Sequence, residues 1–221
     1  MCQYARGLWC AVVLLGGIGQ FLPVTGAAHA VALPPRPGAS CSEDERAALQ
    51  QAVQRRSAGS ELRLCAVGRF PEPGYVVLVA TEQRLRLGVL RGDGTPVRAP
   101  LSELPRAPLA TSLVELSAVD LDGDGVDEVI EVWRRSAHGK MGSDNWLLAR
   151  RLTAAGLGAN LPGPHLSVFV PGFGRCRARW SAAPLAIVVQ VEEASTLPPS
   201  ECLPVGRHRF VLRGDKLVEQ N

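Results

Sequence analysis

The chain has few of the residues with which proteins bind nucleic acids. Aromatic residues make up 5% of its 221 residues, and the formal net charge is only +3 because 21 acidic side chains offset 24 basic ones. Its lysines are limited to Lys140 and Lys216, so nearly every basic side chain is an arginine. Nucleic-acid-binding domains need a strongly basic surface, and those that bind single strands add aromatic side chains for base stacking. The composition therefore argues against a nucleic-acid partner.

Common catalytic and zinc-binding motifs are also missing. The sequence contains no H-E-x-x-H, no G-x-S-x-G and no phosphate-binding P-loop. No C-x-x-C pair is present either, which argues against a structural zinc site. The histidines beyond the N-terminal segment are His138, His165 and His208. These gaps favour a non-enzymatic role, although a site assembled from scattered residues leaves no motif.

The first 30 residues have the pattern of a secretory signal peptide. Arg6 provides a positive start, residues 8–22 form an apolar segment, and Ala28-His29-Ala30 matches an A-x-A cleavage site. The apolar segment is shorter than the roughly 20 residues that span a membrane. We therefore expect cleavage after Ala30 and a periplasmic or secreted protein, residues 31–221, without a stable membrane span. An uncleaved N-terminal anchor is the alternative.

Cleavage would leave four cysteines, Cys41, Cys65, Cys176 and Cys202. An even number in an exported protein predicts two disulfides, although four cysteines allow three pairings. We favour Cys41–Cys65 and Cys176–Cys202, because each pair closes a local loop. In the chain-entropy model, each such loop stabilises the protein by about 3 kcal/mol.

Four of the eight aspartates lie between positions 120 and 127. Asp120, Asp122 and Asp124 alternate with other residues, and Gly123 and Gly125 allow the backbone to coil tightly around them. The D-x-D-x-D-G spacing is typical of calcium loops. Ca²⁺ takes six to eight oxygen ligands in flexible geometry, whereas Mg²⁺ retains waters and demands stricter geometry. The spacing therefore predicts a Ca²⁺ cofactor at a loop over residues 120–131; a solvated acidic turn is the alternative.

Two structural settings are compatible with this loop. An EF-hand would take its ligands from loop positions 1, 3, 5, 7, 9 and 12, which are Asp120, Asp122, Asp124, the Val126 carbonyl, Glu128 and Glu131. However, Asp127 stands at the eighth position, where EF-hands usually carry an aliphatic residue. The segment that follows, residues 129–133, is β-branched and aromatic. We therefore expect antiparallel strands over residues 113–119 and 129–133, with Glu131 outside the metal shell.

The segment L-S-A-V-D-L-D-G-D-G-V-D-E-V-I at residues 116–130 resembles the calcium hairpin of FG-GAP/VCBS-type repeats, which occur in integrin-like β-propellers. The resemblance covers roughly residues 112–133, and no second copy of the loop is present in the sequence. It implies that side-chain oxygens come from Asp120, Asp122, Asp124 and Glu128, and a carbonyl oxygen from Val126. We carry over the hairpin from this family, and not the propeller.

The rest of the sequence predicts a mainly β protein with one N-terminal helix. After a Pro-rich linker (31–40), Ser42 and Glu45 form a capping box, and the helix should end at residues 57–59. Strand-like runs follow at residues 62–67, 75–80, 85–90, 113–119, 129–133, 146–152, 165–170, 186–192 and 207–212. Residues 175–180 alternate as a strand with its arginines on a solvated face, while 156–158 and 162–164 should be loops. We expect a single β-rich domain over residues 41–221, with a propeller-blade-like or sandwich-like sheet.

These patterns together predict an exported, calcium-stabilised, disulfide-containing bacterial protein with a non-enzymatic binding or structural role in the cell envelope. Its partner would be an envelope or extracellular protein or glycan, which the sequence does not specify. The alternatives are an exported enzyme with a structural calcium and an EF-hand-like calcium sensor. A convergent pocket of titratable side chains would favour the enzyme, and helix exposure on calcium addition would favour the sensor.

Overall fold

The computed structural model describes residues 39–82, 84–104, 111–136, 142–170, 174–195, 197 and 201–220, all of which belong to one compact unit, Pro34–Asn221. The predicted signal peptide, residues 31–38 of the predicted linker, and His138 lie outside the described residues. Within the described ranges, we find no helix with the length and apolar character needed to cross a membrane.

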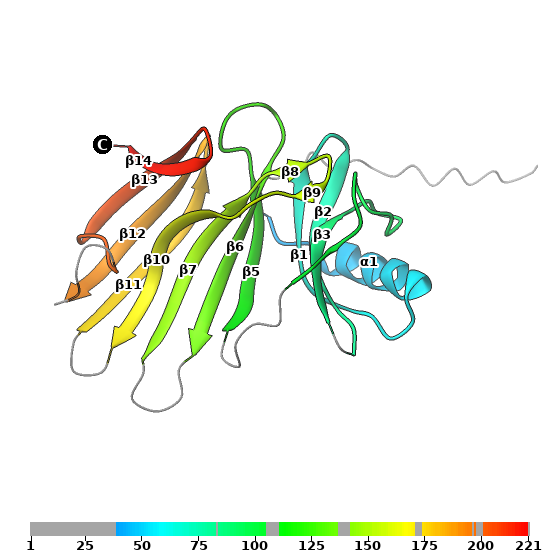
Figure 1. The fold of residues 1–221 in the computed structure, drawn as a ribbon, viewed down its shortest axis with the longest axis horizontal. Helices are drawn as coiled ribbons and strands as arrows, with labels where there is room; N and C mark the ends of the chain where they lie inside the picture. The colour runs from blue at the N-terminus through cyan, green and yellow to red at the C-terminus, as the bar shows by residue number, and fades with distance from the viewer. Residues whose placement is uncertain are drawn as a thin grey trace, which may run out of the picture. The chain divides into compact units, whose positions relative to one another are not determined.

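The described residues are mainly β-structure with one helix, which confirms the predicted fold class (Figure 1). In chain order the elements are α1 (Glu43–Arg56), β1 (Glu61–Arg69), β2 (Pro73–Ala80), β3 (Leu85–Leu90), β4 (Ser102–Glu103), β5 (Thr111–Val119), β6 (Glu128–Ser136), β7 (Ser143–Arg150), β8 (Leu152–Thr153), β9 (Gly156–Leu157), β10 (Leu161–Val170), β11 (Gly174–Ala183), β12 (Ala186–Ser195), β13 (Gly206–Arg213) and β14 (Lys216–Gln220).

The helix begins where its capping box predicts. The Ser42 side chain accepts a hydrogen bond from the Glu45 N–H, and the Ser42 N–H donates to the Glu45 carboxylate at 2.8 Å. The helix ends at Ser57, which adopts an extended conformation. Leu49 and Val53 are buried against strands β1 and β2, so α1 covers one face of the sheet that these strands form (Figure 1).

Strands β1 to β4 form a small antiparallel sheet in sequential order. The face of this sheet opposite α1 packs against strands β5 and β6, and the shared core includes Ala66, Val76, Ala118 and Val129. Strands β1 and β5 approach closely at Gly68, where a Cβ atom would lie only 2.7 Å from the Ala118 Cβ. Glycine is therefore needed at this crossing, and the small sheet lies between the helix and β5–β6.

The large sheet has eight antiparallel strands in the order β14-β13-β12-β11-β10-β7-β6-β5. Strands adjacent in the sheet are also consecutive in the chain, apart from the short β8–β9 hairpin that lies between β7 and β10. One face carries a second core, which includes Ile130, Leu147, Ile187 and Val189. The calcium-loop candidate joins β5 and β6, the two strands that also contact the small sheet.

Two predicted loops instead belong to strands. Residues 162–164 lie inside β10, because this part of the strand pairs with β7 and its pairing with β11 starts only at Ser167. Prolines lack an N–H donor and are tolerated where a strand has a free edge. Irregular register between Pro162 and His165 accommodates them further. The predicted loop at 156–158 contains β9, which pairs with β8, and the predicted strand 146–152 is interrupted at Arg151.

Both favoured disulfides are present. Cys41–Cys65 joins the segment before α1 to β1, with 5.6 Å between the Cα atoms. Cys176–Cys202 joins β11 to the segment before β13, with 5.7 Å between the Cα atoms. Each bond joins segments that are close in the sequence and lie next to each other in the fold, so the predicted local pairing is confirmed.

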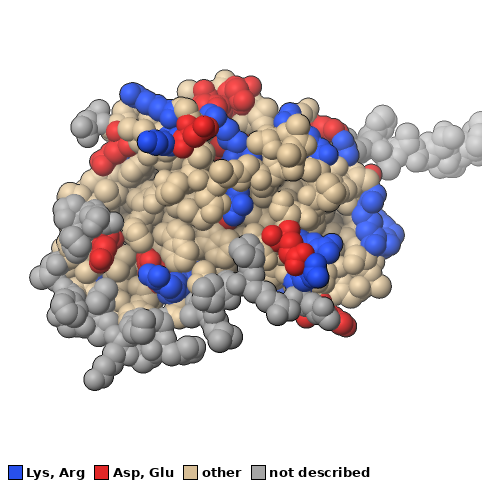
Figure 2. Space-filling view, viewed as in Figure 1, with Lys and Arg blue, Asp and Glu red and all other residues tan. Residues whose placement is uncertain are grey.

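The alternating arginines of β11 lie on a solvated face, as predicted. Their side chains are exposed and pair with carboxylates of the neighbouring strand β12 through Arg175–Glu193, Arg177–Glu192 and Arg179–Glu192. Figure 2 likewise shows acidic and basic side chains next to each other in mixed groups on the face drawn there. The positive charge of the β11 arginines is therefore largely neutralised by the glutamates of β12.

Candidate metal centre

The acidic loop, residues 120–127, connects two antiparallel strands. Val119 at the end of β5 lies opposite Glu128 at the start of β6. This confirms the strand–loop–strand setting, and the alternative with helices on both sides is wrong. Gly123 and Gly125 both have positive φ angles, 82° and 83°, a conformation that glycine adopts without steric cost.

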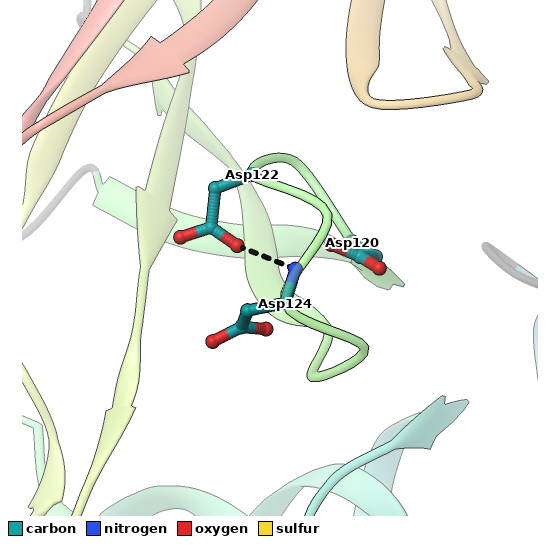
Figure 3. Close-up of side chains that lie close together, drawn as sticks. All are labelled: Asp120, Asp122 and Asp124. Atoms are coloured by element: carbon teal, nitrogen blue, oxygen red, sulfur yellow. Dashed lines mark hydrogen bonds between the residues drawn. The ribbon is translucent and has the colours of Figure 1, made fainter.

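Three aspartate side chains converge on this loop. One oxygen from each of Asp120, Asp122 and Asp124 lies within 4.8 Å of the others. The loop backbone holds these side chains: Asp120 accepts hydrogen bonds from the N–H groups of Gly123 at 2.7 Å and Gly125 at 3.1 Å. Asp122 accepts from the Asp124 N–H at 3.3 Å (Figure 3). Backbone N–H groups of the loop therefore hold the three carboxylates close to one another.

The half-buried Val126 also belongs to the sequence-predicted set. Its N–H donates to the Asp124 carboxylate at 2.7 Å, and its side chain packs against the core between the two sheets. The apolar side chain therefore anchors the end of the loop, while its backbone stays next to the aspartates.

Two arginines from outside the loop reach the acidic cluster. Arg151, between β7 and β8, forms an ion pair with Asp122 at 2.6 Å and a second with Asp215 at 3.3 Å. Arg69, at the end of β1, approaches Asp120 at 3.8 Å. These guanidinium groups offset part of the negative charge, and they connect the loop to the small sheet and to the β13–β14 turn.

Glu128 lies beneath the loop as the first residue of β6. Its side chain is buried and accepts a hydrogen bond from the Leu121 N–H at 2.8 Å, while its other oxygen lies 3.5 Å from the Arg151 Nε. Burial raises the pKa of Glu128 to about 7, although the Leu121 hydrogen bond opposes the shift; the nearby charges of Asp122 and Asp124 add to it. The structure thus places Glu128 against the loop, outside the tight group of three aspartates.

Glu131 is not brought to the cluster. It lies in the middle of β6, fully buried, where its carboxylate forms an ion pair with the Arg150 Nε at 2.6 Å. The Trp133 indole N–H donates to the same carboxylate at 2.7 Å. Burial raises the pKa of Glu131, and the Arg150 charge opposes that shift. Its position agrees with the expectation that Glu131 lies outside the metal shell.

Asp127 is a structural residue of the site that the sequence did not identify. Its side chain is buried and accepts a hydrogen bond from the Arg69 N–H at 2.6 Å, while the Asp127 N–H donates to the Arg69 carbonyl at 2.6 Å. Burial raises the pKa of Asp127, and the bonds to Arg69 oppose the shift. An aspartate at the eighth loop position, where an EF-hand would carry an aliphatic residue, was the available signal.

The two described histidines are each paired with a carboxylate. His165 lies 2.7 Å from Asp144, and this hydrogen bond raises the pKa of His165 although burial opposes it. His208 lies 2.7 Å from Glu219 on the edge strand β14. Both pairs connect neighbouring strands of the large sheet, and both are separate from the acidic cluster.

No protein-family model matches this chain, and searches of the curated proteins and of the solved structures gave no match either. The interpretation of the site therefore depends on its own geometry.

Proposed function

We propose that the acidic loop binds one Ca²⁺ ion, and that this ion stabilises an exported protein with a non-enzymatic binding or structural role. The observation that carries the proposal is the convergence of three aspartate oxygens within 4.8 Å of one another. Ca²⁺ binds oxygen at about 2.3–2.6 Å, so two of its ligands can be at most about 5 Å apart. One ion could therefore contact all three carboxylates.

The donor set also fits a hard cation. Carboxylate oxygens come from Asp120, Asp122 and Asp124. The resemblance to the FG-GAP/VCBS-type hairpin implies two further ligands, the Glu128 carboxylate and the Val126 carbonyl. A carboxylate oxygen that accepts one backbone hydrogen bond keeps a second lone pair for a metal. The ion would have to share Asp122 with Arg151, so we expect moderate affinity, in the range of extracellular calcium modules, about 10⁻⁴ to 10⁻³ M.

Two further observations support an exported protein without catalytic function. Disulfides persist mainly in oxidising compartments, and the described residues contain two of them. The buried acidic groups Asp127 and Glu131 and both described histidines have ion-pair or hydrogen-bond partners within the protein. These groups therefore stabilise the fold, which favours a binding or structural role of the protein over acid–base catalysis.

Thermal melting in excess calcium and in chelator tests the calcium proposal. At free Ca²⁺ about tenfold above the dissociation constant, linkage should add about 1.4 kcal/mol to the free energy of unfolding and raise Tm by a few degrees. Asp120→Ala should abolish the increase, because both oxygens of Asp120 help to shape the loop.

Asp93→Ala is a matched control. Asp93 is an exposed aspartate that, like Asp120, accepts a hydrogen bond from a backbone N–H of its own turn, that of Thr95 at 2.8 Å, between β3 and β4. The rise in Tm on adding calcium (the calcium increment) should be the same in Asp93→Ala as in the wild type. Identical wild-type melting temperatures in both buffers would refute calcium binding.

A further inference from the structure

A cleft lies between the acidic loop and the turn that joins β11 to β12. Its volume is about 380 Å³, and its lining consists of Arg69, Val119, Asp120, Ala182, Ala183, Pro184 and Leu185. Small-molecule sites occupy about 300–1,000 Å³ and combine an apolar lining with a few polar groups. The cleft has this character, because five aliphatic residues surround one guanidinium group and one carboxylate.

Leu185 occupies an unfavourable backbone conformation at the mouth of this cleft. Its φ angle is 55°, a left-handed value that glycine or asparagine usually supplies in a two-residue turn. The side chain remains 47% exposed, so burial offsets little of this strain. It also reaches the acidic loop, since a Cβ atom on Gly123 would lie 3.3 Å from a Leu185 methyl carbon. Strained residues of this kind concentrate at ligand sites.

Arg69 has donor capacity that the protein does not use. Its Nη2 lies 3.5 Å from Asp127 and 3.8 Å from Asp120, longer than the 2.7–2.9 Å of a good charge-assisted hydrogen bond. The Nε is buried, but the side chain is 43% exposed and lines the cleft, so the outer part of the guanidinium group remains accessible to a ligand. A guanidinium group with spare donors in an aliphatic cleft suits a carboxylate, which it can bind through two parallel bonds.

We propose that this cleft binds a small aliphatic carboxylate, with the anionic group on Arg69 and the branched apolar group against Leu185 and Ala182. The site is also coupled to the loop through Asp120, which lines the cleft and belongs to the aspartate cluster. A cation on Asp120 would neutralise the negative charge that otherwise faces Arg69. Binding of the cation should therefore increase the affinity for the carboxylate, and the reverse. This coupling, unlike the cleft itself, rests on the proposed calcium binding.

Titration with isovalerate, followed by NMR chemical-shift changes, tests the cleft. Isovaleramide keeps the apolar group without the charge, and acetate keeps the charge without most of the apolar group. Isovalerate should bind at least tenfold more tightly than either. Equal affinity for isovalerate and isovaleramide would overturn the assignment of Arg69. A peptide that ends in leucine, with a free or an amidated C-terminus, separates a chain terminus from a free acid as the source of the carboxylate.

Two variants on the same strand give a matched comparison. Ala182→Asp places a negative charge in the cleft at an exposed position and should reduce isovalerate affinity at least tenfold. Ser181→Asp adds the same charge one residue earlier, at an exposed position that does not line the cleft, and should leave the affinity unchanged. If both variants bind isovalerate as the wild type does, the ligand lies elsewhere and the proposal is wrong.

Leu185→Gly provides a readout that a purely structural role would not produce. Glycine relieves the left-handed strain, so Tm should rise while isovalerate affinity falls. All titrations are run first in chelator, where the cleft is tested independently of any metal. A second series in calcium should show about fivefold tighter isovalerate binding. Unchanged affinity in a protein whose calcium binding has been measured would refute the coupling alone.

Discussion

Asp127 and Arg69 hold each other by two opposed hydrogen bonds, each 2.6 Å long, between residues that are 58 positions apart. The Asp127 N–H donates to the Arg69 carbonyl, and the Arg69 N–H donates to the Asp127 carboxylate. Arg69 ends β1 of the small sheet, and Asp127 ends the acidic loop of the large sheet. The loop is therefore fixed to the second sheet by the protein itself, at a point next to the three clustered aspartates.

Asp127→Ala should lower the free energy of unfolding by about 2–3 kcal/mol, because it removes a buried carboxylate and leaves the part-buried Arg69 N–H without its acceptor. Urea denaturation in chelator measures this loss without any contribution from calcium. Asp124→Ala is the control: its side chain is exposed and accepts one hydrogen bond within the loop, so the loss should stay below about 1 kcal/mol. Equal losses would contradict the structural role of Asp127.

Glu131→Gln tests whether Glu131 takes part in binding the proposed calcium ion. The substitution leaves the Arg150 guanidinium, whose side chain is 17% exposed, without its counter-charge. Breaking a buried pair in this way should cost about 3 kcal/mol, and Tm should fall equally in calcium and in chelator. The calcium increment should survive, because Glu131 is outside the aspartate cluster. Loss of the increment in this variant would mean that Glu131 binds the ion.

Local sequence signals predicted much of the fold. The capping box at Ser42 placed the start of α1, and the β-branched residues after Asp127 predicted a strand where an EF-hand would have a helix. Both signals act over a few residues, where the chemistry of the side chain decides the backbone conformation. The disulfide pairing was predictable for a related reason, since both bonds join segments of close sequence separation, 24 and 26 residues.

Long-range relationships could not be read in the same way. Nothing near Asp127 in the sequence indicates Arg69, and nothing near Gly123 indicates Leu185; each pair meets only because two β-hairpins are adjacent in the fold. Pro162 was misread as a loop signal, because its tolerance in β10 depends on how far the neighbouring strand β11 extends. The aspartates were found by their spacing, while the residues that hold and neutralise them come from distant strands.

Removal of either disulfide should destabilise the protein by a similar amount. The chain-entropy model gives about 3.5 kcal/mol for a loop of about 25 residues. The double variants Cys41→Ala/Cys65→Ala and Cys176→Ala/Cys202→Ala should therefore show comparable losses in urea denaturation. None of these four cysteines lines the aspartate cluster, so the rise in Tm with calcium should persist in each variant. A double variant as stable as the wild type would show that its disulfide contributes nothing to the folded state.

His208 joins the edge strand β14 to the segment that carries Cys202. Its Nδ1 lies 2.7 Å from the Glu219 carboxylate and its Nε2 lies 2.7 Å from the Pro204 carbonyl. Only the protonated imidazole can donate to both acceptors, because the neutral ring has one N–H. Burial lowers the pKa of His208, but the bonds to Glu219 and Pro204 raise it by more, so the net shift is upward from 6.5.

The raised pKa of His208 predicts how the free energy of unfolding varies with pH. The folded protein holds this proton more tightly than the unfolded chain, so the stabilisation is complete below the unfolded pKa, about 6.5. It is lost as pH rises through the higher folded pKa. The difference in unfolding free energy between the wild type and His208→Gln should therefore shrink as pH rises from below about 6.5 to above the folded pKa. Urea denaturation across this range measures it, and Glu219→Gln should move the loss to lower pH. A difference that stays constant or grows with pH would show that His208 is neutral in the folded protein.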